Sequence, residues 1–158
     1  MNKTHTQNGG LYLSVTGASV LLFVLALGPG LYGSEYSHLF SWQYKGFDLL
    51  CHQMPDRSYH IAGVPMAVCS RCIGIYGAFV VGWLALPIFS KVSISHKTRI
   101  GWLIGLIILN LVDVTGNFFE MWSNTLTTRL VLGTLLGLSV AVLFNDEFFS
   151  HKKRIEYG

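Results

Sequence analysis

Four long runs of apolar residues dominate the sequence. They cover residues 11–31, 68–89, 100–119 and 128–144, to within a few positions. A helix needs about 20 mostly apolar residues to cross the hydrocarbon core of a bilayer, and each run is close to that length. The pattern therefore predicts an all-α fold, a polytopic membrane protein built as a four-helix transmembrane bundle.

The segment between the first two runs, 32–67, has a helical pattern of its own. Its apolar residues recur at spacings of four, seven and three, which places them on one face of a helix: Tyr36, Phe40, Phe47 and Leu50. An amphipathic helix of this kind lies flat in the membrane interface. We predict an interfacial helix in this loop, although Gly46 weakens it.

Lysine and arginine residues predict the orientation, because they are enriched in cytoplasmic loops. With the N-terminus inside, the cytoplasmic side holds the larger group: Lys3, Lys91, Lys97, Arg99, Lys152, Lys153 and Arg154. The external side holds Lys45, Arg57, Arg71 and Arg129. This assignment gives a cytoplasmic N-terminus (1–10), a membrane domain (11–145), an external loop (32–67) and a basic cytoplasmic tail (146–158).

The composition supports a membrane protein and excludes several other classes. Charged residues make up 12% of the chain and hydrophobic residues 51%, whereas an ordinary soluble domain is about 25% charged. A solvated globular enzyme and a disordered tail are both excluded. Lys and Arg number 11 against 8 Asp and Glu, too small an excess for a nucleic-acid partner. The expected partner is the lipid bilayer.

The three cysteines follow the pattern C-H-x16-C-x2-C: Cys51, Cys69 and Cys72, with His52 after the first. The C-x2-C pair begins the second run, so a helix would place both sulfurs on one side of its first turn. The helix N-terminus and the neighbouring Arg71 favour thiolates, which are typical ligands of soft metals. We predict a metal site formed by Cys51, His52, Cys69 and Cys72. Zinc is favoured, another soft divalent metal is an alternative, and an iron–sulfur cluster is less expected.

Other interpretations of these residues stay open. A disulfide or a redox-active pair is reasonable on an oxidising external face, and cysteines also pack as small apolar residues. His52 could be a structural histidine. Tyr76, one turn below Cys72, could pack in the core or place its hydroxyl beneath the cysteines.

The third run carries a stripe of polar residues spaced along one helix face: Asn110, Asp113, Asn117 and Glu120. A carboxylate inside a membrane-spanning helix costs about 2.5 to 3.5 kcal/mol at the helix centre, so it turns inward and finds a partner. The stripe predicts either a structural polar network, with Asp113 bonded to Arg129 or to hydroxyls, or a functional path. In the fourth run, Gly133 and Gly137 are typical of tight helix packing.

The same residues resemble a known family. CHQMPDRS and CSRCIGIY are similar to the signature of an uncharacterised family of small prokaryotic membrane proteins, domain-of-unknown-function family 2085. The resemblance extends to Asp113, Ser123, Asn124 and Arg129, and departs where Val114 replaces a frequent glycine. It implies a prokaryotic cytoplasmic membrane protein and a shared site that includes Asn124. It implies no reaction.

Several functions remain open at this point. Metal binding at the external end of the bundle is preferred, and the predicted accompanying polar or ion-pair site comprises Arg57, Arg71, Asp113, Asn117 and Arg129, with Tyr76, Glu120 and Asn124 as accessory residues. A thiol–disulfide or quinone-linked redox protein is one alternative. A small ion or metal transporter using Asp113 is another, and would require a homo-oligomer. A subunit or scaffold of a larger membrane complex is a further alternative. No familiar hydrolase or nucleotide motif is present, so no catalytic residue is assigned.

Overall fold

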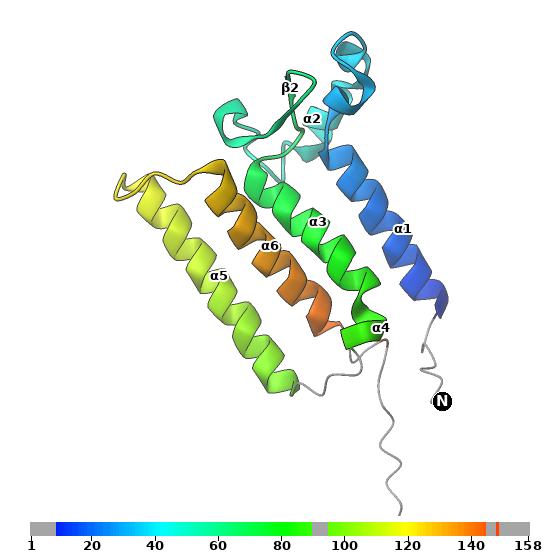
Figure 1. Cartoon of the computed structure of the whole chain (residues 1–158), viewed down its shortest axis with the longest axis vertical. Coiled ribbons are helices and arrows are strands. Elements are labelled where there is room, and N and C mark those ends of the chain that lie inside the picture. Colours follow the sequence, from blue (N-terminus) through cyan, green and yellow to red (C-terminus); the bar gives the residue numbers. More distant parts are fainter. Residues whose placement is uncertain (1–8, 90–94, 145–147, 149–158) are drawn as a thin grey trace, which may run out of the picture.

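The structure is a computed structural model that describes residues 9–89, 95–144 and 148. It is mostly helical, and four helices run side by side (Figure 1): α1 (Gly9–Ala26), α3 (Ser70–Leu84), α5 (His96–Phe118) and α6 (Leu126–Leu143). Helix α3 packs most extensively against α6, while α1 contacts α3 and α5 contacts α6. The order across the layer is therefore α1, α3, α6, α5, and the helix that follows Cys69 lies near its centre.

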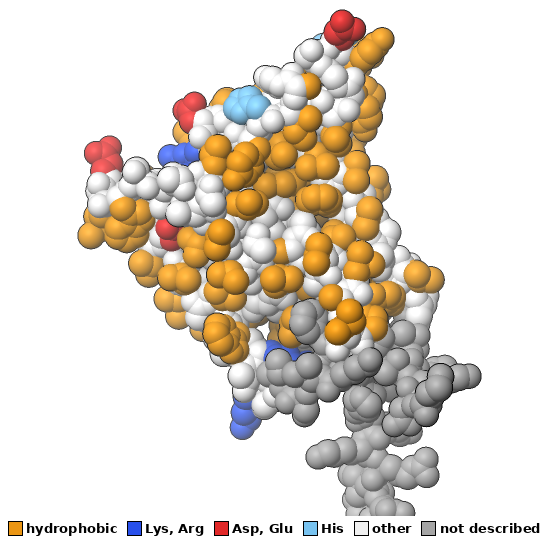
Figure 2. All heavy atoms as spheres, viewed as in Figure 1, with side chains coloured by type: hydrophobic (Ala, Val, Ile, Leu, Met, Phe, Trp, Pro, Cys, Tyr) orange, Lys and Arg blue, Asp and Glu red, His pale blue; other side chains and the backbone are white. Residues whose placement is uncertain are grey.

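Three of these helices are long and apolar enough to cross a membrane: α1, α5 and α6. Helix α3 is apolar but has 15 residues, and the short helix α4 (Leu86–Phe89) follows it directly. Pro87, the second residue of α4, has no backbone N–H to continue the hydrogen-bond pattern of α3, so the helix is interrupted before it. Apolar side chains cover the middle of the face in Figure 2, and charged side chains lie mostly towards its two ends. A mostly helical fold with three candidate membrane-spanning helices is therefore confirmed.

Helix boundaries differ from the predicted runs. Helix α1 stops at Ala26, and the last part of the first run forms a 3-10 turn, η1 (Pro29–Tyr32). Gly28 has a φ of 85°, and a Cβ there would lie 2.6 Å from the backbone nitrogen of Ala67. The chain thus turns after α1 because its backbone at Gly28 packs directly on the segment that leads to α3. Helix α5 begins at His96, four residues before the predicted start.

The predicted interfacial helix is not confirmed as one continuous element. The segment forms a 3-10 turn, η2 (Ser37–Phe40), and a six-residue helix, α2 (Trp42–Phe47). Of the predicted apolar face, Phe47 is buried, whereas Tyr36 is 57% and Leu50 64% exposed. The helical preference around Gly46 is weak. Burial of Phe47 against the main helices therefore decides the local structure, and the predicted interfacial helix does not continue.

The rest of the loop leads to the Cys69–Cys72 pair. A 3-10 turn, η3 (Pro55–Arg57), precedes a small antiparallel hairpin of β1 (His60–Ile61) and β2 (Val64–Pro65). Ala62 and Gly63 have φ values of 50° and 78°, as a two-residue hairpin turn requires. The hairpin returns the chain to the end of the helical layer.

A compact apolar core joins this loop to the helices. Its buried members are Ala26, Phe47, Cys51, Ala67, Val68 and Ile73. They come from the end of α1, the end of α2, the approach to α3 and α3 itself. The external loop of the prediction is therefore a packed cap on one end of the layer. Most of the predicted segments 1–10 and 146–158 lies outside the described residues, as does Lys91.

Candidate metal centre

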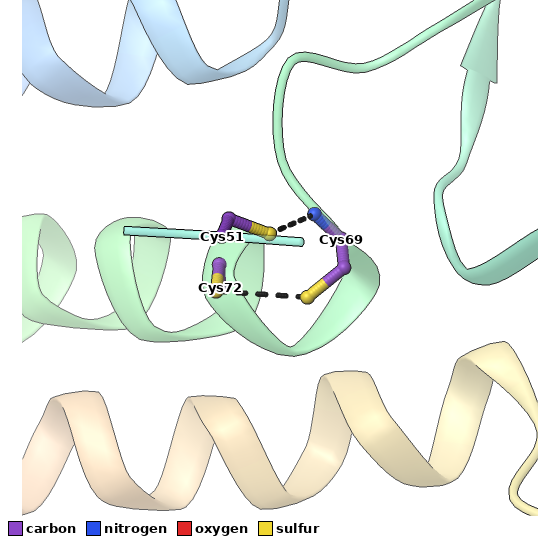
Figure 3. A group of neighbouring side chains, drawn as sticks. All are labelled: Cys51, Cys69 and Cys72. Atoms are coloured by element: carbon purple, nitrogen blue, oxygen red, sulfur yellow. Dashed lines mark hydrogen bonds between the residues drawn. The ribbon is translucent and has the colours of Figure 1, made fainter. Parts of the chain in front are cut away.

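Three cysteines from two separate segments meet at the capped end of the layer (Figure 3). Cys51 follows α2, Cys69 directly precedes α3, and Cys72 lies in the first turn of α3. The Cys69 sulfur is 3.6 Å from the Cys72 sulfur, and the Cys69 backbone nitrogen donates to the Cys51 sulfur at 3.2 Å. All three Sγ atoms lie within 4.8 Å of one another.

The loop holds Cys51 in place through side-chain to backbone hydrogen bonds. The Gln53 amide donates to the carbonyl oxygen of Tyr44 at 2.5 Å, and the Tyr44 hydroxyl donates to the carbonyl oxygen of Pro65 at 2.6 Å. These bonds connect the Cys51 segment, α2 and the hairpin that leads to Cys69. Sequence reasoning assigned no role to Tyr44, and the Gln that follows Cys-His in the signature was the available signal for Gln53.

Hydrogen bonding favours a thiolate at Cys69, whereas burial opposes it. Cys51 is 6% exposed, and Cys69 and Cys72 are half-buried beside it. Hydrogen bonds with Cys51 and then Cys72 lower the pKa of the Cys69 thiol, and backbone hydrogen bonds from Cys72 and Arg71 act in the same direction, while burial raises it. One thiolate in the group is therefore favoured, at Cys69. Tyr76 packs on the same core, with its ring centroid 6.0 Å from that of Phe47.

The sulfur spacing suits a shared metal ion. Tetrahedral zinc with Zn–S bonds of about 2.3 Å holds its sulfur ligands about 3.8 Å apart. The Cys69–Cys72 separation is close to this value, and the Cys51 sulfur lies within the same group. A disulfide requires sulfurs about 2.05 Å apart, and all three cysteines are free. Three thiolates at this spacing can bind one soft cation.

Two predicted residues of the site have exposed side chains. His52 is exposed and is not part of the sulfur group, and Arg57 is exposed in η3. Adjacent residues of an extended segment project to opposite sides, so burial of Cys51 turns the next side chain outwards. The structure therefore brings together three of the four predicted ligands.

The polar stripe of α5 forms a connected network with two other helices. Asp113 forms an ion pair with Arg71 of α3, and the same carboxylate oxygen accepts from the Asn124 amide at 2.7 Å. Asn117 accepts from the Asn124 backbone nitrogen at 3.1 Å and from Arg129 of α6 at 3.4 Å. The predicted partner of Asp113 was Arg129 or a hydroxyl; its partners are instead Arg71 and Asn124.

Asn110 and Glu120 are the other two polar residues of the predicted stripe. Asn110 donates to the carbonyl oxygens of Leu106 at 2.9 Å and Leu132 at 3.4 Å. Glu120 lies beyond the end of α5, is exposed and has a φ of 56°. Apart from Glu120, the stripe thus links α5 to α3, α6 and the turn between α5 and α6.

A cleft between α5 and α6 reaches this network. Its volume is about 570 Å³, and its lining is apolar except for Asp113, Asn124, Thr127 and Thr128.

The fold and the site define a helical membrane protein with three cysteines gathered at one end of its helices. The chain belongs to the family described as predicted membrane protein (DUF2085), whose sequence profile matches residues 51–143. That range contains all three cysteines and the whole polar network.

The chain is similar to an uncharacterised protein, MJ1492 of Methanocaldococcus jannaschii. It is 34% identical over 106 residues, which cover 67% of this chain and 68% of the relative. No solved structure matches the chain significantly.

Proposed function

We propose that this protein is a four-span membrane protein that binds one soft divalent metal ion, preferably zinc, through Cys51, Cys69 and Cys72. The mutual proximity of the three sulfurs is the observation that carries the proposal. Soft thiolates from two distant segments, held by hydrogen bonds of their own loop, form a donor set that suits zinc and related metals.

The four-span topology is supported by the length of α3 and α4 together. They occupy residues 70–89 with a one-residue break, about the length that spans a bilayer. If α3 and α4 together form one membrane crossing, then α1, α5 and α6 bring the total to four. An even number of crossings places both termini on the same side of the membrane. The distribution of Lys and Arg then favours cytoplasmic termini and an external cysteine end.

A tetrahedral metal ion held by these three cysteines would have one further coordination position. Zinc sites with three protein ligands keep the fourth position for water or another exchangeable group. His52 is exposed next to Cys51, so it completes the tetrahedron only if its segment rearranges. We therefore assign the fourth position to water in the resting protein.

Metal analysis of the purified protein tests this proposal. We expect about one metal ion per chain after purification through a tag without histidine, because three clustered thiolates bind soft metals tightly. The Cys72→Ser variant should lose the metal. The matched control is His38→Ala, which removes an exposed imidazole from the same loop and should keep it. A wild-type protein without metal, or a Cys72→Ser variant with a full complement, contradicts the proposal.

A second candidate, a quinone-linked thiol redox protein, is favoured by the apolar cleft whose lining includes Asp113 and Asn124. Arg71, which lies between two cysteines in sequence, contacts the carboxylate of Asp113. In this reaction the Cys69 and Cys72 thiols form an S–S bond and release two electrons and two protons. The quinone takes up both electrons and both protons and becomes a hydroquinone.

Counting thiols distinguishes this candidate from metal binding. If the redox reaction occurs, a short-chain quinone should reduce the number of reactive thiols in the metal-free protein from three to one. If three thiols remain after prolonged incubation with the quinone, the redox candidate is excluded.

A further inference from the structure

Three arginines gather at the cysteine end of the helical layer. Arg57 belongs to η3, Arg71 to the first turn of α3 and Arg129 to the first turn of α6. A Cβ on Gly133 would lie 2.1 Å from the carbonyl oxygen of Arg71, and Arg129 is one turn before Gly133 on the same helix face. Arg129 therefore lies beside Arg71, and the charged groups that act on it are Arg57, Arg71, Asp113 and, as a thiolate, Cys69.

Positive charge exceeds negative charge in this cluster. Asp113 forms an ion pair with Arg71, whereas Arg57 and Arg129 have no carboxylate partner among the described residues. A zinc ion with three thiolates would carry one net negative charge. That charge is smaller than the two positive charges that remain, so the metal centre alone leaves an excess.

The cluster also contains buried donors without acceptors. The Nε atoms of Arg71 and Arg129 are buried, and neither has a hydrogen-bond partner. A buried donor without an acceptor is costly, and more so when it carries charge. Guanidinium groups match the oxygens of phosphate in a planar, two-pronged geometry. The N-termini of α3 and α6, at this same end, add further positive potential.

We propose that Arg57, Arg71 and Arg129 form a binding site for a phosphate group at the cysteine end of the layer. Inorganic phosphate and the headgroup of an anionic phospholipid present this same chemistry. Phosphate binding would be a second function beside metal binding, and it does not require a bound metal. Bound phosphate would neutralise the excess charge and would accept hydrogen bonds from the buried Nε groups.

Binding measurements on the full chain in an uncharged detergent test the site. One arm titrates sodium phosphate against sodium chloride at matched ionic strength. The other compares phosphatidylglycerol with zwitterionic phosphatidylcholine, with retained lipid counted by native mass spectrometry. Preferential binding in the phosphate arm identifies a free anion, preferential binding in the lipid arm identifies a headgroup, and either supports the proposal.

Two variants and a control identify the residues. Arg57→Gln should weaken binding about tenfold, because it removes a charge-assisted hydrogen bond, and its exposed position makes the fold insensitive to the change. Arg129→Lys keeps the charge but removes the Nε donor, so it should also weaken binding. Lys45→Gln removes an exposed positive charge from nearby α2 and should leave binding unchanged. The proposal is overturned if neither ligand binds better than its control, or if Arg57→Gln binds as tightly as the wild type.

Discussion

Replacing Gly133 by alanine is expected to destabilise the protein by about 3 kcal/mol or more, because overpacking a tight helix contact forces the backbones apart. The added methyl group would lie 2.1 Å from the carbonyl oxygen of Arg71. That atom belongs to the backbone of α3, so no side chain can rotate to make room. The free energy of unfolding, measured by circular dichroism during denaturation in detergent, reports the effect.

Gly105→Ala is the matched control for this substitution. A Cβ at Gly105 in α5 meets nothing within 4 Å, and alanine is a better helix former than glycine by about 1 kcal/mol. The control should therefore be neutral or stabilising. Equal stability of the Gly133→Ala and Gly105→Ala variants would show that α3 and α6 do not pack as closely as described.

Removing the carboxylate of Asp113 should cost about 3 kcal/mol of stability, because breaking a largely buried ion pair leaves the partner charge uncompensated. The Arg71 and Asp113 side chains are 18% and 15% exposed. In Asp113→Ala the Arg71 guanidinium loses its ion-pair partner and the Asn124 amide loses its acceptor. The same unfolding experiment measures the loss.

Two further variants separate the ion pair from a general effect of charge. Glu120→Gln removes an exposed carboxylate near the same end of α5 and should change stability little. A double variant, Arg71→Met with Asp113→Ala, should recover part of the stability, because it removes the unpaired charge. An Asp113→Ala variant as stable as the wild type would show that the pair does not hold α3 and α5 together.

The features that depend on local sequence were predictable. An apolar run near 20 residues long indicates a membrane helix without knowledge of its neighbours, and α1, α5 and α6 match three of the four runs. The C-x2-C spacing at a helix start brings Cys69 and Cys72 together through the geometry of one turn. Bringing Cys51 close to them required only that the loop fold back. The presence of a third soft ligand in that loop suggested this.

The partners of Asp113 depend on the order of the helices, and a single sequence carries little information on that order. With α3 next to α6 and its first turn within reach of α5, the Arg71 guanidinium meets the Asp113 carboxylate. Asn124 reaches the same oxygen because the turn after α5 folds back over the helix end. Both contacts arise from packing between segments distant in sequence or separated by a turn.

The position of His52 was decided by backbone geometry close to Cys51. Gln53 has a φ of 48°, which turns the chain immediately after His52, and the Gln53 amide bonds back to Tyr44. Cys51 is drawn into the core while the adjacent imidazole stays in solvent. The residue pattern alone offered both side chains as ligands.

X-ray absorption spectroscopy of the copurified metal tests the central claim most directly, because it counts the atoms bound to the ion. For zinc, a first shell with about three sulfur atoms at about 2.3 Å and one lighter atom at about 2.0 Å is predicted. The sulfur count should fall in the Cys72→Ser variant if any metal remains. A first shell of nitrogen and oxygen alone would contradict the assignment of Cys51, Cys69 and Cys72 as the metal site.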